Sequence, residues 1–295
     1  MNALDLAKVG EFIQANIGPQ FHEKKLVKIS ALTLNTIIKR KNPYLFRAKG
    51  SNSASDYIKS VLDASLSSGE ESNFGDFIEN VAIFVAGQVY DGRKSGIRGI
   101  DLEIEDGRRK YLVSIKSGPN WGNSGQRQDL VKSFQTASKI LRTSGGSAEM
   151  EIVCVEGCCY GIDDIPLKTT HQRLCGQRFW KFISGGHEAL YRELIEPLGH
   201  EAEVRAKDLQ FAYDAKLNAL TASFVDQFCD EGVINWDRLI RFNSGGKSEQ
   251  LALRVKAGEP IVDDDPDGGT SAEHVYDSPE YDASVEEANR LDDAQ

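Results

Sequence analysis

The chain has 295 residues, of which 40% are hydrophobic and 27% are charged, and its formal net charge at pH 7 is −10. These values are typical of a globular protein and exclude a wholly disordered chain, a collagen-like fibre and a small disulfide-stabilised scaffold. No stretch approaches the roughly 18 consecutive apolar residues of a membrane helix, and no secretory signal pattern opens the chain. The odd number of cysteines, five, indicates reduced thiols. We therefore expect a cytoplasmic protein.

Charge is distributed unevenly along the chain. Residues 261–295 hold twelve Asp or Glu and a single base, Arg290, while the rest of the chain is near neutral. Residues 256–295 show no apolar periodicity and are predicted to be a disordered acidic tail. This tail is interpreted as a solubilising appendage, and a DNA-mimicking, self-inhibiting segment is the alternative. By contrast, residues 22–50 hold eight Lys or Arg against one Glu. They form a cationic patch suited to a polyanion, or a solvated helix face.

The first part of the chain is predicted to be helical. Residues 3–50 read as mostly helical with a break at Pro43, and helices are expected over 54–66 and 73–89, on either side of Gly69 and Ser72. The second of these carries apolar residues at helical spacing, which predicts a buried face. Residues 1–70, which include the cationic patch, are interpreted as a helical N-terminal region that forms an arm contacting a polyanion such as DNA.

A different pattern follows from residue 91. A glycine-rich polar segment leads into two strands around a tight turn at Asp106 and Gly107. A helix over 124–142, capped by Ser124, a strand over 148–157 and further helices beyond residue 176 come next. The sequence therefore predicts a mixed α/β core over 71–200, flanked by helices, with a C-terminal helical region over 201–255 and the tail after it.

The two strands can be placed residue by residue. If Asp106 and Gly107 form the loop, Asp101 lies opposite Leu112 and is a diagonal neighbour of Ser114. Because side chains alternate along a strand, Asp101, Ser114 and Lys116 share one polar face. The other face is apolar and consists of Leu102, Ile104, Tyr111, Val113 and Ile115.

A polar face of this kind suits phosphodiester hydrolysis. The reaction needs a metal ion held by carboxylates, an activated water and a cation near the developing negative charge. Asp101 would bridge Mg²⁺ to a phosphate oxygen, Lys116 would orient the water, and the backbone carbonyl of Ile115 would supply a further hard oxygen ligand. The alternative is a surface hairpin with two exposed cross-strand ion pairs, Glu103–Lys110 and Glu105–Arg108.

These residues lie within a recognisable pattern. The run GIDLEI…YLVSIKSGPNWGNSGQ, preceded by NFGDFIENVA, resembles type II restriction endonucleases of the PD-(D/E)XK nuclease superfamily, and more narrowly a PmeII-like family. The resemblance covers about residues 25–245. Four further stretches support it: KNPYLFRAKG, GCCYG, LCGQRFWKFISG and the segment around INWDRLIRFNS.

The resemblance implies a fold, an activity and a set of site residues. Asp101 matches the metal-binding aspartate, Lys116 the catalytic lysine and Glu79 the acidic residue of the first core helix. The implied core is α-β-β-β-α-β, and the implied activity is Mg²⁺-dependent cleavage of double-stranded DNA at a short site, which leaves 5′-phosphate ends. A homodimer on a palindromic site and a cognate DNA methyltransferase in the same system are the implied partners.

Ser114 departs from the pattern, because the superfamily usually has Asp or Glu at this position. Glu79 or Glu103 would have to compensate, and we favour Glu79. Ser114 itself would contact a metal-bound water at most. Two alternatives therefore stay open: another DNA nuclease of the superfamily, for repair or a particular DNA structure, and a non-cleaving DNA-binding protein.

Candidate DNA contacts fall into two groups. Residues after Lys116 suit phosphates or base edges, namely Asn120, Trp121, Asn123, Gln126, Arg127 and Gln128, with a capped loop as the alternative. The basic residues Lys39, Arg40 and Lys41 suit phosphates, with a structural helical arm as the alternative.

Residue types that bind zinc occur in a second group, consisting of Cys154, Cys158, Cys159, His171 and Cys175. The spacing is not that of a paired zinc module, and Cys154 is expected to be a core residue. His187 and His200 are isolated in the sequence and are interpreted as structural.

Overall fold

The computed structural model describes residues 1–107, 109–143, 150–165 and 170–246. Residues 1–243 form one compact unit, and a second unit begins at Ser244. The predicted acidic tail, residues 256–295, lies outside the described residues. None of the described helices is both long and apolar enough to span a membrane.

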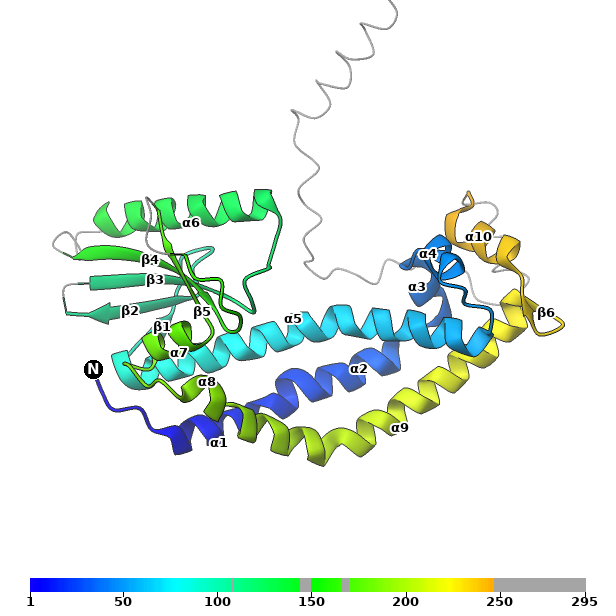
Figure 1. The fold of residues 1–295 in the computed structure, drawn as a ribbon, viewed down its shortest axis with the longest axis horizontal. Coiled ribbons are helices and arrows are strands. Elements are labelled where there is room, and N and C mark those ends of the chain that lie inside the picture. Colours follow the sequence, from blue (N-terminus) through cyan, green and yellow to red (C-terminus); the bar gives the residue numbers. More distant parts are fainter. Residues whose placement is uncertain (108, 144–149, 166–169, 247–295) are drawn as a thin grey trace, which may run out of the picture. The chain divides into compact units, whose positions relative to one another are not determined.

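A five-stranded mixed sheet forms one end of the first unit (Figure 1). Its strands, in spatial as well as chain order, are β1 (Arg93–Lys94), β2 (Leu102–Asp106), β3 (Arg109–Lys116), β4 (Glu151–Cys158) and β5 (Gln172–Cys175). The first three are antiparallel, whereas β3, β4 and β5 run parallel. The predicted mixed α/β class is confirmed, and β5 is an additional strand that the sequence analysis did not predict.

The register of β2 and β3 differs from the prediction by two residues. Asp106 was expected in the turn, but it belongs to β2 and pairs with Arg109, so the turn follows it. As a consequence, Glu105 pairs with Lys110 and Glu103 pairs with Leu112. The predicted strand register, with Glu103 opposite Lys110 and Asp101 opposite Leu112, is therefore wrong, although the side chains of Glu103 and Lys110 do form an ion pair. A shift of two residues leaves every side chain on its original face, so the predicted polar and apolar faces are retained.

Helices cover both faces of the sheet. The apolar face of β2 and β3 packs with α5 (Ala54–Tyr90) and α7 (Gln177–Ile183) in one core, with Val81 and Trp180 among its buried members. On the other face, α6 (Ser124–Thr143) buries Leu130, Phe134 and Ala137 against Leu112 and Cys154. These three residues recur at helical spacing, so they share one side of the helix, and Leu141 on the same side is partly buried.

The longest of the described helices, α5, has 37 residues. Two separate helices were predicted here, and that prediction is wrong. A glycine within a helix costs only about 1 kcal/mol, and Gly69 has a packing role. A Cβ at Gly69 would lie 2.0 Å from Nζ of Lys28, so the glycine leaves room for a side chain of the neighbouring helix. The predicted domain boundary between residues 70 and 71 falls inside α5.

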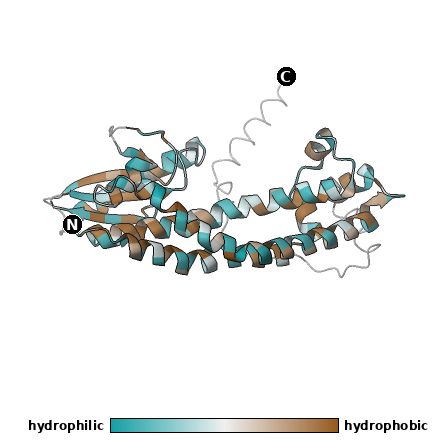
Figure 2. Cartoon of the chain, turned by 60° about the horizontal axis from the view of Figure 1, so that its bottom comes forward, coloured by the Kyte–Doolittle hydropathy of each residue, from teal (hydrophilic) through white to brown (hydrophobic). Residues whose placement is uncertain are grey.

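Other helices run along α5. These are α1 (Leu6–Ile17), a π-helical segment (Gly18–Glu23), α2 (Lys24–Ala31) and α9 (Ile195–Phe228), joined to the sheet region by α8 (Leu190–Glu193). Hydrophobic and hydrophilic residues alternate along these helices, as Figure 2 shows. Their apolar sides therefore bury one another, as amphipathic helices require in water.

A small cluster lies at the start of α5, at the end opposite the sheet (Figure 1). It comprises α3 (Leu34–Lys39), α4 (Pro43–Ala48), α10 (Trp236–Ser244) and a hairpin of β6 (Cys229–Asp230) and β7 (Val233–Ile234). Pro43 does not simply break the chain. It opens α4 directly after the cap Asn42, where its missing N–H is no loss. Stacked aromatic rings, including Tyr57 and Phe224, fill the interior.

Candidate active site

Asp101 and Lys116 converge on one side of the sheet. Asp101 directly precedes β2, and its backbone N–H donates to the carbonyl of Val113 at 2.9 Å. Lys116 is the last residue of β3, and its Nζ lies 3.9 Å from Oδ2 of Asp101. The side chain of Lys116 is 26% exposed and that of Asp101 is 23% exposed, so a substrate can reach both. The structure therefore has the acidic and basic groups side by side, as the alternation along the strands requires.

The carboxylate of Asp101 is oriented by β3. Its Oδ2 accepts hydrogen bonds from the backbone N–H of Ile115 at 2.6 Å and from Oγ of Ser114 at 3.2 Å. Continuing the β2–β3 register places Ser114 directly opposite Asp101, whereas a diagonal relationship was predicted. Ser114 is only 1% exposed. The serine thus fixes the aspartate, and a buried hydroxyl finds its partner.

Glu79 approaches this pair from α5. Burial raises the pKa of Glu79, and the negative charge of nearby Asp101 raises it further, while Lys94 and Lys116 act in the opposite direction. Nζ of Lys94, in β1, lies 3.4 Å from Oε1 of Glu79. Two carboxylates and a lysine therefore share one half-buried site, and the two carboxylates repel each other there.

Glu103 belongs to a different network. Its carboxylate lies 3.0 Å from Nζ of the buried Lys110 and accepts a hydrogen bond from Oγ of Ser95 at 2.8 Å. Burial alone would raise the pKa of Glu103, but these hydrogen bonds prevail and hold it below its ordinary value. The pair with Lys110 is buried, not exposed as the surface-hairpin alternative requires. Of the two glutamates considered as replacements for an acid at Ser114, Glu79 is the one that interacts with Asp101.

The chemistry of these donors fits a hard divalent cation. Asp101 and Glu79 offer carboxylate oxygens, and the carbonyl of Ile115 is a hard oxygen on the strand between Ser114 and Lys116. Within the described part of the chain, no three His, Cys, Asp or Glu side chains are grouped closely enough to hold a metal. Two carboxylates completed by water suit Mg²⁺, which usually keeps several of its waters. A cation would also relieve the repulsion between the two carboxylates.

The segment after Lys116 contains one residue that faces the site and two that cap the start of α6. Trp121 places its ring centroid 5.0 Å from Nζ of Lys116. Asn123 and Gln126 instead bond to each other's backbone N–H groups, at 3.0 and 2.9 Å, in a reciprocal capping arrangement at the start of α6. The predicted cap Ser124 is therefore wrong by one residue. Asn120 and Arg127 are exposed.

The second group of candidate DNA contacts lies elsewhere. Lys39, Arg40 and Lys41 belong to the cluster near the start of α5, whereas Glu79 lies in the last third of that helix. Nζ of Lys41 donates to the carbonyl of Ala64 at 2.9 Å, which is a structural contact. Lys39 and Arg40 are exposed. The structure does not bring this group to the site of Asp101.

The sequence analysis missed Glu156, which lies beside the site. The β3–β4 register places it next to Ser114 on the same face, and it is 1% exposed. It is paired with Nε of Arg173 at 3.0 Å and Nε2 of His171 at 3.3 Å, and it accepts a hydrogen bond from Nε1 of Trp121 at 2.5 Å. Burial alone would raise the pKa of Glu156, but these partners lower it to about 2. The signal was present: in the strand EIVCVEGC, one carboxylate stands at the exposed start, but the other, Glu156, lies among buried residues.

The cysteines do not form a common site. Cys154 packs in the core beneath α6, whereas Cys159 packs in the core on the opposite side of the sheet. The expected core role of Cys154 is confirmed. His171 is paired with Glu156, and His187 contacts Oε2 of Glu193 at 2.6 Å. A zinc site that gathers all the residues considered is therefore incompatible with the fold.

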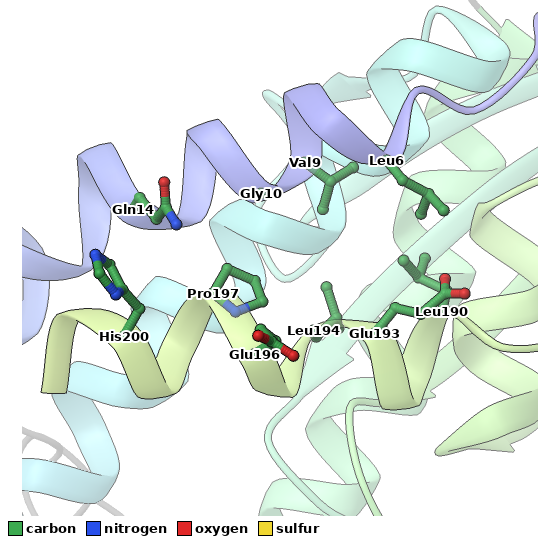
Figure 3. A pocket seen from close by; sticks show the side chains of 10 residues that line it. All are labelled: Leu6, Val9, Gly10, Gln14, Leu190, Glu193, Leu194, Glu196, Pro197 and His200. Atoms are coloured by element: carbon green, nitrogen blue, oxygen red, sulfur yellow. The ribbon is translucent and has the colours of Figure 1, made fainter. Parts of the chain in front are cut away.

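Two hollows differ in their relation to the site. A groove of about 650 Å³ lies beside the loop after Lys116 and is lined by Asn120, Trp121 and Tyr160 on one side and by Phe74 of α5 on the other. A smaller pocket of about 350 Å³ lies between α1 and the start of α9, with His200 at one end (Figure 3). None of the candidate active-site residues lines the smaller pocket.

A mixed sheet flanked by helices, with two carboxylates and a lysine at its edge, is compatible with the nuclease fold of restriction endonucleases. A protein-family model described as "Type II restriction endonuclease EcoO109I" matches residues 7–206, which is more than half of the chain. The protein is accordingly a type II restriction endodeoxyribonuclease, a hydrolase that acts on DNA.

Within that class, the chain belongs to the type II restriction endonuclease EcoO109I family. The match supports the class that the sequence predicted, but it does not support the PmeII-like subfamily. A search of curated proteins gave no match.

Proposed function

We propose that the protein is a Mg²⁺-dependent, site-specific endonuclease that cuts both strands of DNA and leaves 5′-phosphate ends. The observation that carries the proposal is the 3.9 Å separation between Nζ of Lys116 and Oδ2 of Asp101, beside the carboxylate of Glu79. Membership in a restriction endonuclease family supports DNA as the substrate.

Each group has a distinct role in this proposal. Asp101, Glu79 and the carbonyl of Ile115 hold the cation, which when bound neutralises phosphate charge and makes water more acidic. Lys116 orients the attacking water or stabilises the negative charge that develops on the phosphate. Water adds to phosphorus as the bond to the 3′-oxygen breaks, so the products are a 5′-phosphate and a 3′-hydroxyl. Ser114 holds Asp101 in position through the hydrogen bond to Oδ2.

The proposal extends to domains and partners. Residues 71–200 form the catalytic core, and residues 1–70 form an arm that contacts DNA phosphates through Lys39 and Arg40. Two exposed residues are further DNA contacts: Asn120, in the loop after Lys116, and Arg127, in the first turn of α6. Two copies of the chain bind a palindromic site, because each copy cuts one strand. A cognate methyltransferase protects host DNA at the same site.

The test is digestion of DNA of known sequence by the purified full chain with Mg²⁺, with Ca²⁺ or with EDTA. We expect discrete fragments with Mg²⁺ only, and mapping of the ends gives the cut position. Asp101→Ala and Lys116→Ala should abolish cleavage but largely retain DNA binding in Ca²⁺. Lys8→Ala is a matched control, because Lys8 forms an exposed ion pair with Asp5 outside the site.

Full cleavage by Asp101→Ala or Lys116→Ala would contradict the site. Cleavage that depends on DNA structure, without discrete fragments, would favour a different nuclease activity. Specific binding without cleavage by the wild-type protein would favour a non-cleaving DNA-binding protein.

A further inference from the structure

Trp121 lies between the candidate lysine and the interior of the sheet. It follows Lys116 by five residues in the loop SGPNWG. Its ring centroid is 5.0 Å from Nζ of Lys116, and its Nε1 donates a hydrogen bond to Oε1 of Glu156 at 2.5 Å. The indole thus contacts a cation with its ring and a buried anion with its N–H.

Glu156 is a rigid anchor for the indole. It lies on β4, is 1% exposed, and is held by Arg173 at 3.0 Å and His171 at 3.3 Å. The ring of His171 in turn packs against Phe134 of α6, with 5.3 Å between the ring centroids. An acceptor fixed by several groups leaves the donor few alternative positions, so the indole N–H is directed toward the sheet.

The loop backbone is anchored as well. The carbonyls of Lys116 and Ser117 accept hydrogen bonds from the N–H groups of Cys159 and Tyr160, at 2.9 and 3.1 Å. A Cβ at Gly118 would lie 2.2 Å from the ring of Tyr160, so the loop packs directly against that ring. The backbone of the loop and the indole N–H of Trp121 are therefore both held in place in the absence of DNA.

Lys116 needs such support. A lysine side chain has several rotatable bonds, and the ion pair of Lys116 with Asp101, at 3.9 Å, is at the edge of ion-pair range. An aromatic face attracts an ammonium group by its quadrupole, and this attraction has a preferred geometry. The indole of Trp121 therefore restricts where Nζ of Lys116 can lie.

We propose that Trp121 is a positioning residue for Lys116, held in place by Glu156, and that it sets the ammonium group where the cleavage reaction requires it. This inference rests on the proposed function, since it assumes that Lys116 takes part in cleavage. It replaces the expectation from sequence that Trp121 contacts DNA. Misplacement of a reacting group by about 1 Å costs about 100-fold in rate, which sets the scale of the expected effect.

The experiment measures single-turnover cleavage and DNA affinity separately, with the full chain. Enzyme in excess over a cognate DNA fragment gives the rate constant and amplitude with Mg²⁺, and binding in Ca²⁺ gives Kd. We expect Trp121→Ala to lower the rate constant about 10–100-fold while Kd changes less than about threefold. Trp121→Phe keeps a ring beside Lys116 and should recover most of the lost rate.

Two controls separate positioning from stability. Trp236→Phe changes another tryptophan that faces a cation, Arg47 at 5.2 Å, in the cluster far along the chain, and should leave the rate constant unchanged. A role in folding alone would lower the amplitude of Trp121→Ala at an unchanged rate constant, which would overturn the proposal. A rate constant for Trp121→Phe as low as that of Trp121→Ala would also overturn it.

A direct role of Trp121 in DNA binding would give a different result. If Trp121 stacks on DNA, Trp121→Ala should weaken binding in Ca²⁺ by about tenfold or more, because base stacking contributes on that scale. This outcome would overturn the proposal. Lys116→Ala is assayed in parallel: if it cleaves fully, the proposed function fails, whereas an inactive Lys116→Ala beside a normal Trp121→Ala defeats only this inference.

Discussion

Oγ of Ser114 donates a hydrogen bond to Oδ2 of Asp101 across 3.2 Å, at a position where an acidic residue was expected. The hydroxyl therefore interacts with the carboxylate and does not compete with it as a ligand. A carboxylate at position 114 would lie directly opposite Asp101 and repel it. The arrangement indicates that the second carboxylate of the site comes from another element, α5.

Replacing Ser114 by Ala tests this role. We expect Ser114→Ala to slow single-turnover cleavage about tenfold or more, because Asp101 loses one of the two hydrogen bonds to its Oδ2, and a single hydrogen bond to a charged group contributes about 1.5–3 kcal/mol. Ser138→Ala is a matched control, since Ser138 is a serine on α6 that contacts Cys154. Equal rates for wild type and Ser114→Ala at saturating Mg²⁺ would show that the hydroxyl is dispensable.

The Mg²⁺ requirement distinguishes Glu79 from Glu103. Glu79→Gln should raise the Mg²⁺ concentration for half-maximal cleavage by about tenfold or more, because the site loses one of its two carboxylates. Glu103→Gln should leave that concentration nearly unchanged, because Glu103 is engaged by Lys110 and Ser95. A titration of initial rate against Mg²⁺ measures both variants, and the reverse order would transfer the ligand role to Glu103.

Glu156 should make the protein sensitive to acid. Its pKa is lowered from 4.5 to about 2 in the folded state, so its contribution to stability is present above pH 4.5 and is lost as the pH falls toward 2. The full contribution is up to about 3 kcal/mol. Urea unfolding at several pH values should show the stability advantage of wild type over Glu156→Gln shrinking below pH 4.5. A difference that stays constant with pH would contradict the lowered pKa.

Helix capping and DNA contact make different predictions for Asn123, which caps α6, and for Arg127, in the first turn of α6. Asn123→Ala should lower the free energy of unfolding by about 1 kcal/mol, because it removes a cap, and should leave DNA affinity unchanged. Arg127→Ala should leave stability unchanged but weaken DNA binding and reduce the slope of its salt dependence by about 1 if Arg127 contacts phosphate. Thermal unfolding measures the stability of both variants, and DNA binding at several salt concentrations measures their affinity. A loss of affinity in Asn123→Ala would show that Asn123 contacts DNA after all.

Several parts of the fold follow from local pattern alone. The helix α6 and its buried residues are specified by apolar spacing, and the two faces of the β2–β3 hairpin are specified by strict alternation. The two-residue error in the hairpin register changed no face, because the alternation has a period of two. For the same reason, Asp101 and Lys116 stayed on one side of the sheet.

Other parts required contacts between distant segments. The strands β5, β6 and β7 are too short for a periodic signal, and they exist because neighbouring strands complete their hydrogen bonds. Gly69 and Ser72 suggested an interruption, yet α5 continues through them, because its packing against the neighbouring helices outweighs the local cost.

Sequence by itself determined the mixed α/β class, because helices and strands differ in the spacing of their apolar residues. It also determined the polar face of the hairpin and the placing of Asp101 and Lys116 on that face, because side chains alternate along each of two adjacent strands. Tertiary structure decided that Glu79 interacts with Asp101, that Glu103 pairs with the buried Lys110, and that Trp121 joins Lys116 to Glu156. These relationships depend on how strands and helices remote in sequence pack together, and packing of this kind leaves no periodic trace in the chain.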